Sequence, residues 1–188
     1  MKKFFGILGS AILCAVVACA CLVGCGDKTP KTETVSEWNM GVTEDFTIPH
    51  WKAVEGTDNM EIVDNADAKD GKALKVTVAS GGGVSFLCND NHGLKSTAVT
   101  LRIYSDKAGD VTLNVQEAGG DWEQLFMNEE TATDYATISL TTGWNDYTLE
   151  FKRAVAYKFN NFVFKSTQAE TVEFLVDTIT FTKPVEAE

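Results

Sequence analysis

From about residue 44 onward, the chain consists of short runs in which apolar and polar residues alternate. A period of two places successive side chains on opposite faces of a β-strand, so each run predicts a strand with one buried face. Turn residues separate the runs at intervals of roughly 8–15 residues. The absence of βαβ spacing predicts an all-β protein, an antiparallel β-sandwich. The predicted strands are 45–48, 60–63, 74–78, 84–88, 98–104, 111–116, 122–127, 135–140, 146–151, 161–164 and 172–181.

Two of these runs have outward faces of unusual composition. In 98–104 the apolar residues occupy one face, which leaves Arg102 and Tyr104 on the other. In 111–116 the same alternation leaves Asn114 and Gln116 outward. We expect the two strands to be neighbours or nearly so, which would gather these four side chains on one face. Such a face suits a glycan cleft, but an ordinary solvated sheet face draws on similar residues, and both interpretations stay open.

The N-terminus has the pattern of an export signal. Lys2 and Lys3 precede an uncharged apolar run over 4–23, and a polar segment begins at Asp27. A charged start, an apolar stretch and small residues before a cut are typical of a signal peptide. The run is also about long enough to span a bilayer, so an uncleaved membrane anchor remains the alternative.

The sequence Leu22-Val23-Gly24-Cys25 resembles the lipobox of bacterial lipoproteins. The resemblance implies cleavage between Gly24 and Cys25 and a diacylglycerol on the Cys25 thiol. The mature protein would then be extracytoplasmic and lipid-anchored to the bacterial cell membrane. We therefore predict a signal peptide over 1–24, a lipidated cysteine and flexible tether over 25–37, and one sandwich domain over 38–188, since 26–37 is mostly polar and charged.

Charge and cysteine usage narrow the range of partners. The chain carries a formal net charge of −11, and Lys2 and Lys3 lie in the predicted signal. An acidic surface repels nucleic acid and anionic lipid head groups, so we expect no nucleic-acid partner and membrane contact through the N-terminal lipid only. Of the five cysteines, Cys88 alone follows Cys25, so the domain has no internal disulfide. We expect a monomer.

Five segments together resemble carbohydrate-binding modules with the galactose-binding-like jelly-roll fold. The strand Gly143-Trp144-Asn145-Asp146-Tyr147-Thr148-Leu149-Glu150-Phe151 resembles a Gly-Trp strand of those modules. The other segments are 44–46 with Trp51, 70–76, 160–164 and 173–181, in the order in which the modules have them. The resemblance covers residues 44 to 181 and implies a jelly roll, and carbohydrate as the ligand.

Carbohydrate binding combines aromatic faces that stack on sugar rings with planar polar groups that bond to the hydroxyls. On this basis the candidate residues for a polysaccharide or oligosaccharide are Arg102, Tyr104, Asn114, Gln116, Trp122, Gln124 and Asn160. Trp122 follows Gly119-Gly120-Asp121, which fits a stacking platform or equally a half-buried core cap. Trp144 we assign to the core, because the resemblance implies a packing role for it.

The resemblance also implies a structural calcium ion, since modules of this fold often hold one with carboxylates from the first and last strands. Asp177 matches the closing-strand position, Asp45 the opening one, and Asp70 lies in the turn before residue 74. Ca²⁺ prefers six to eight oxygen ligands. Thr47 stands where a second acid is often found, and in the alternative interpretation Asp177 bonds to a loop.

Catalysis has little support in the sequence. His50 and His92 lie neither in metal-ligand spacing nor beside a nucleophile. Glu117, Asp121 and Glu123 are acids of the kind that glycosidases use, but surface acids are frequent here. We therefore predict a non-catalytic surface lipoprotein that captures carbohydrate. The alternative is a structural or adhesive lipoprotein that binds another protein through the same sandwich.

Overall fold

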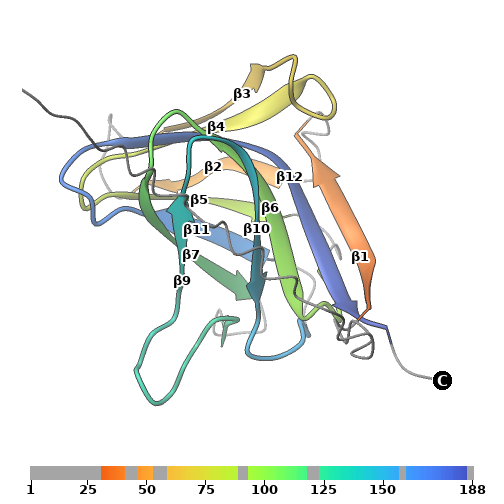
Figure 1. The fold of residues 1–188 in the computed structure, drawn as a ribbon. Helices are drawn as coiled ribbons and strands as arrows, with labels where there is room; N and C mark the ends of the chain where they lie inside the picture. The colour runs from red at the N-terminus through yellow and green to blue at the C-terminus, as the bar shows by residue number, and fades with distance from the viewer. Residues whose placement is uncertain are drawn as a thin grey trace, which may run out of the picture.

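The computed structural model describes residues 31–40, 46–52, 59–88, 93–117, 123–156 and 160–185. These residues form two antiparallel six-stranded sheets that pack face to face (Figure 1). The all-β antiparallel sandwich is confirmed, and the described ranges contain no helix. Consequently, no helix long and apolar enough to span a membrane occurs within them.

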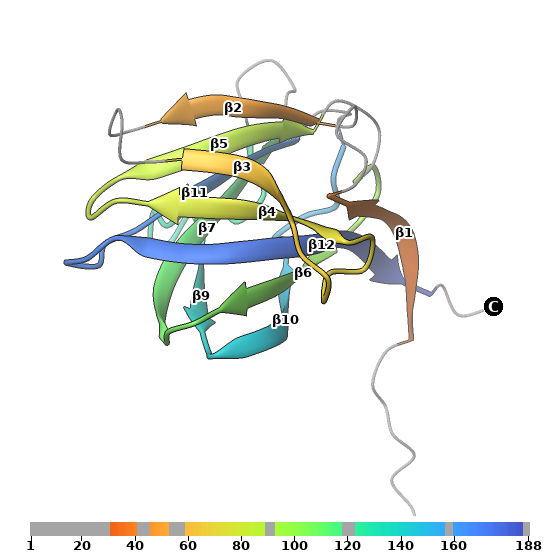
Figure 2. The ribbon, with the colours of Figure 1, turned by 90° about the horizontal axis from the view of Figure 1, so that it is seen from above.

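The first sheet, sheet A, is organised around the long strand β12 (Val172–Pro184). Its order is β10 (Gly143–Glu150), β6 (Ala98–Ser105), β12, β4 (Lys72–Val78) and β3 (Asn59–Asp64). β1 (Thr32–Asn39) also pairs with β12, beyond the part of β12 that pairs with β4. Figure 2 shows β12 running between β6 and β4. The final strand β12 thus pairs directly with β1, β4 and β6.

The second sheet, sheet B, has the order β2 (Phe46–Lys52), β5 (Gly83–Cys88), β11 (Asn160–Lys165), β7 (Gly109–Glu117) and β8 (Glu123–Gln124). β9 (Ala136–Leu140) pairs with the other half of β7. The short turn between β6 and β7 therefore carries the chain from sheet A to sheet B.

The predicted flexible tether over 25–37 extends too far, because the first strand already begins at Thr32. Thr32–Glu37, assigned to the tether, form most of β1 and pair with the C-terminal half of β12. The composition of this segment is polar, but β-branched Thr34 and Val35 lead into Trp38, which is buried and contacts Phe181 edge-on at 5.6 Å. The burial of one tryptophan and a full set of strand hydrogen bonds outweigh the polarity that indicated disorder.

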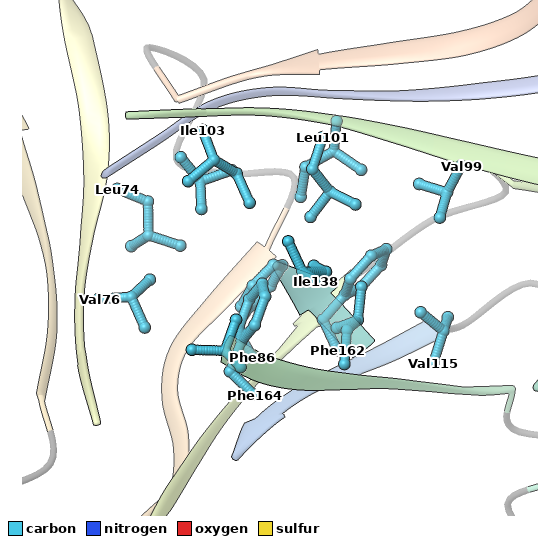
Figure 3. Close-up of a cluster of buried hydrophobic side chains, with 14 of the residues drawn as sticks. Leu74, Val76, Phe86, Val99, Leu101, Ile103, Val115, Ile138, Phe162 and Phe164 are labelled. Atoms are coloured by element: carbon cyan, nitrogen blue, oxygen red, sulfur yellow. The ribbon is translucent and has the colours of Figure 1, made fainter. Parts of the chain in front are cut away.

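Apolar side chains from both sheets fill the space between them. Figure 3 shows Leu101 and Ile103 of β6 facing Phe86 and Phe162 of sheet B. The rings of Phe86 and Phe162 stack at 5.1 Å. The inward residues of β6 and β7 are those that the alternation predicted, Val99, Leu101, Ile103, Val111, Leu113 and Val115, each at most 1% exposed. The polar residues between them consequently lie on the two outer surfaces of the sandwich.

Candidate functional site

The structure divides the predicted carbohydrate-binding residues between opposite surfaces. Arg102 and Tyr104 lie on β6 in sheet A, whereas Asn114 and Gln116 lie on β7 in sheet B. The expectation that the two strands are neighbours is wrong, because the turn between them crosses from one sheet to the other. Alternation predicts which side chains face outward, but the same pattern occurs in both sheets.

The remaining predicted residues are only partly described. Gln124 lies on β8 in register with Gln116, so these two amides are cross-strand neighbours as expected of one site. Asn160 begins β11, and its side chain lies outside the described part of the chain. Trp122 also lies outside the described residues.

The outer surface of sheet A carries a cluster that we call the arginine face: Arg102, Tyr104, Trp144 and Asp146. Trp144 pairs with Tyr104 across β10 and β6, and their rings lie 5.4 Å apart. The Arg102 guanidinium carbon lies 4.4 Å from the centre of the Trp144 ring. The assignment of Trp144 to the core is therefore wrong. Its indole packs on the outside of the sheet, with the guanidinium of Arg102 over its ring.

Arg102 is held in place by a buried acid. The Asp177 carboxylate is fully buried, accepts a hydrogen bond from Arg102, and also accepts one from the Lys69 amide at 3.0 Å. Arg102 donates in addition to the Asp67 carbonyl at 3.3 Å. A register shift in β12 between Val176 and Thr178 places Asp177 in a bulge, which turns its side chain toward Arg102.

Other charged groups of this surface are also paired. Lys69 forms an ion pair with Glu37 of β1, and this hydrogen bond raises the pKa of Lys69. The Tyr104 hydroxyl donates to Asp106 at 2.6 Å, a contact that raises the pKa of Tyr104. A shallow groove of about 540 Å³ lies beside these residues, lined by Arg102, Asp146, Lys69, Glu37, Asp177 and Thr180 among others. Four of the charged residues that line this groove form two ion pairs, Lys69 with Glu37 and Arg102 with Asp177.

The described part of the predicted calcium site does not fit the ion. Arg102 and the Lys69 amide already occupy the two carboxylate oxygens of Asp177, and the guanidinium places a positive charge where Ca²⁺ would sit. Asp70 is exposed, and Asp45 lies outside the described residues. Within the described ranges, no group of three metal-binding side chains occurs. The calcium site as a whole stays a prediction.

The outer surface of sheet B has a different character. The register aligns Ser85, Val163 and Asn114 in one row across β5, β11 and β7. In the next row, Asn161 lies between Leu87 and Gln116. We call the residues Ser85, Asn114, Gln116, Asn161 and Val163 the amide face. Ser85, Asn114, Asn161 and Val163 are each at most 7% exposed, so this is a polar surface that is largely withdrawn from water.

The amide face contains polar atoms for which the described residues supply no hydrogen-bond partner. Asn114 donates through Nδ2 to Asp134 at 3.1 Å, and Asn161 donates through Nδ2 to Gln116 at 2.7 Å. The Oδ1 atoms of both asparagines and the Ser85 hydroxyl are buried and have no hydrogen-bond partner among the described residues. Buried polar atoms are almost always paired, so these three oxygens require a partner such as water or the hydroxyl of a ligand.

The pairing of Ala136 with Leu113 brings an aromatic residue, Tyr135, to the edge of this face. Tyr135 follows Asp134 directly, precedes β9 and is 45% exposed. Tyrosines this exposed provide a flat apolar surface together with a polar group. Sequence reasoning missed Tyr135, Asp134 and Asn161. The alternating run into β9 was visible, but nothing in it indicated that β9 would pair with β7 beside Asn114.

An ion-pair network holds the end of the amide face near β8. Glu117 is fully buried, is paired with Arg153, and accepts a hydrogen bond from the Ala156 amide at 2.8 Å. Arg153 also pairs with Glu123 of β8. The arginine thus ties the short strand β8 and the segment after β10 to the end of β7, which fixes Gln124 next to Gln116.

Several solved structures with a similar architecture are carbohydrate-binding modules. A family 11 carbohydrate-binding module from Clostridium thermocellum, solved with a β-1,3-1,4-mixed-linked tetrasaccharide, matches with a TM-score of 0.55 at 13% identity, over 82% of this chain and 100% of the module. The fold of this chain is a jelly-roll β-sandwich like that of the module. TmCBM27, a module studied for specific mannan recognition, matches with a TM-score of 0.53 at 14% identity, over 82% of this chain and 99% of that one.

A family 29 carbohydrate-binding module matches comparably, with a TM-score of 0.52 at 13% identity, over 82% of this chain and 92% of that one. The predicted jelly-roll fold is confirmed by these likenesses. No protein-family model and no curated protein sequence matches the chain.

Proposed function

We propose that this protein binds a polysaccharide or oligosaccharide through the amide face. The observation that carries the proposal is the set of three buried oxygens, on Ser85, Asn114 and Asn161, that lack a partner among the described residues. A sugar hydroxyl can donate a hydrogen bond to an oxygen of this kind. The modules with the same fold support carbohydrate as the class of ligand.

The neighbouring groups suit the same ligand. Tyr135 offers an exposed ring for stacking beside Asn114, and Gln116 adds a planar amide between Asn161 and Gln124. Aromatic stacking and hydrogen bonds to planar side chains are complementary contributions, because a pyranose ring has an apolar face and a polar rim. On the arginine face the charge of Arg102 is matched by Asp177 and its guanidinium lies over the Trp144 indole, so we do not place the ligand there.

We propose further that the protein is not an enzyme. Of the acids that could form a glycosidase pair, Glu117 and Glu123 are both bound to Arg153, and Glu117 is fully buried. Both carboxylates are thus engaged by the same arginine and are not free to flank a glycosidic bond as an acid and base pair would. Incubation with a bound polysaccharide should accordingly release no reducing ends.

We propose the cellular setting from the sequence of the N-terminus. A lipid on Cys25 would anchor the protein outside the bacterial cytoplasm. Since β1 begins at Thr32, the domain would start only a few residues after that cysteine. The proposed role is therefore capture of carbohydrate close to the membrane. Metabolic labelling with an alkyne fatty acid tests the anchor: Cys25→Ala should abolish labelling.

Isothermal titration calorimetry of the purified protein with soluble β-glucans, mannans and xylans tests the binding function. We expect saturable binding to at least one polysaccharide and a loss of about tenfold in affinity in Asn114→Ala, equivalent to ~1.4 kcal/mol for one ligand hydrogen bond. Asp146→Ala, on the arginine face, is the control and should bind normally. Absence of binding by folded protein to a broad glycan array would exclude the proposal.

The alternative is a protein-binding role, which would require an exposed apolar patch. In the described ranges the exposed large apolar side chains are Met127, Tyr135 and Val185, which come from two separate segments. An interface of the usual kind needs a larger contiguous patch. This observation favours carbohydrate over a protein partner.

A further inference from the structure

Asp134 decides how the Asn114 amide is oriented. The Asp134 carboxylate accepts a hydrogen bond from Asn114 at 3.1 Å. An ionised carboxylate has no proton to donate, so only the amide nitrogen of Asn114 can face it. The orientation of this asparagine is thereby fixed by chemistry, and its carbonyl oxygen is the atom left unpaired.

The second amide pair of the face is not constrained in this way. Asn161 and Gln116 bond to each other at 2.7 Å, and each side chain contains both a donor and an acceptor. Both amides can turn over and keep their mutual bond, so this pair can adapt to the ligand group in front of it. The orientation of the Asn114 amide is therefore fixed, whereas that of the Asn161–Gln116 pair is not.

Building on the proposed function, we infer that Asp134 is a specificity-determining residue that makes the amide face select hydroxyl donors and reject carboxylates. Asn114 Oδ1 can pair only with a donor, which a sugar hydroxyl supplies and a uronate carboxylate does not. The negative charge of Asp134, one hydrogen bond away, opposes an anionic ligand as well. The ligand class is thus a neutral, hydroxyl-rich polysaccharide.

A basic residue on the same surface makes the inference testable. Lys165 of β11 is exposed and pairs in register with Thr112, the outward residue that precedes Asn114 on β7. If Lys165 governed ligand choice, acidic glycans would bind better than neutral ones. The opposite preference is expected if Asp134 and Asn114 govern it.

The experiment compares one glycan in two chemical forms. The probes are the neutral polysaccharide that binds best in calorimetry and the same polysaccharide after oxidation of its primary alcohols to carboxylates. The wild-type protein should bind the oxidised form at least tenfold more weakly than the neutral form. Asp134→Asn frees the Asn114 amide to turn, so we expect several-fold weaker binding of the neutral form and several-fold stronger binding of the oxidised form.

Two further variants separate this local effect from charge and from folding. Asp146→Asn removes the same charge from the arginine face and should leave the preference unchanged. Asp134→Glu keeps an acceptor at this position and should retain the preference for the neutral form. Thermal unfolding of each variant establishes that it is folded before it is compared.

The outcomes distinguish this inference from the proposed function. Wild-type protein that binds neither form contradicts the proposed function itself. Equal binding of both forms, a preference for the oxidised form, or a preference that Asp134→Asn leaves unchanged overturns the role of Asp134 while carbohydrate binding stands. A shift of equal size in Asp146→Asn assigns the preference to net charge and also overturns it.

Discussion

The two outer surfaces of the sandwich differ in how their polar side chains are paired. On the arginine face, the buried carboxylate of Asp177 is matched by Arg102, and Arg102 lies over Trp144. On the amide face, Asn114 and Asn161 each use the amide nitrogen, and the oxygen has no partner among the residues that the structure describes. The arginine face has more aromatic and charged residues, but Asp177, Arg102 and Trp144 contact one another. Several unsatisfied oxygens gathered on one face are therefore a better sign of a ligand surface than the number of aromatic and charged residues.

The largest expected effect is a loss of stability without a loss of affinity, in a variant of the arginine face. Arg102→Met leaves Asp177 buried without its cation, and removal of one partner from a buried ion pair costs about 3 kcal/mol of unfolding free energy. Urea denaturation measures this cost. Affinity for the polysaccharide should not change in the folded variant. A loss of affinity comparable to that of Asn114→Ala would show that the arginine face takes part in binding.

A smaller effect is expected at the edge of the amide face. Tyr135→Ala removes an exposed ring, so the unfolding free energy should change by less than about 0.5 kcal/mol. Affinity should fall by about 1 kcal/mol, the contribution of one aromatic contact. Tyr135→Phe keeps the ring and should restore most of the affinity. Unchanged calorimetry in Tyr135→Ala would remove this side chain from the site.

The smallest effect concerns calcium. Because Arg102 already neutralises Asp177, we expect any effect of EDTA on the melting temperature to be the same in the wild-type protein and in Asp177→Ala. Differential scanning fluorimetry with EDTA and with added Ca²⁺ measures it. A decrease in melting temperature with EDTA that disappears in Asp177→Ala would restore Asp177 as a calcium ligand and change the comparison of the two faces.

The sequence predicted the parts of the fold that depend on local alternation. Leu101 and Leu113 face the core as expected, and so Arg102 and Asn114 face outward. The alternation contains no information about which sheet a strand joins, and for that reason Arg102 and Asn114 were placed together. Trp144 was misplaced because a glycine–tryptophan start is compatible with either face of a strand.

Site residues were predictable only where a single strand determines them. Asn114, Gln116 and Gln124 could be named because they lie on or beside one alternating run. Asn161 and Asp134 become site residues through pairing partners 45 and 20 residues away. Asp177 stood out in the sequence, but the arginine that neutralises it lies 75 residues earlier, and the bulge that turns it there leaves no local signal.

The position of β12 has a consequence for the order in which the molecule folds. β12 is the last strand of the described chain, yet it binds β1, β4 and β6. β1 is among the first residues of the domain to be synthesised, and it cannot find its partner until the C-terminal segment is available; the Glu37–Thr180 contact spans 143 residues. Such long-range pairing makes folding slow. Sheet A therefore cannot be completed until the C-terminal segment has been synthesised.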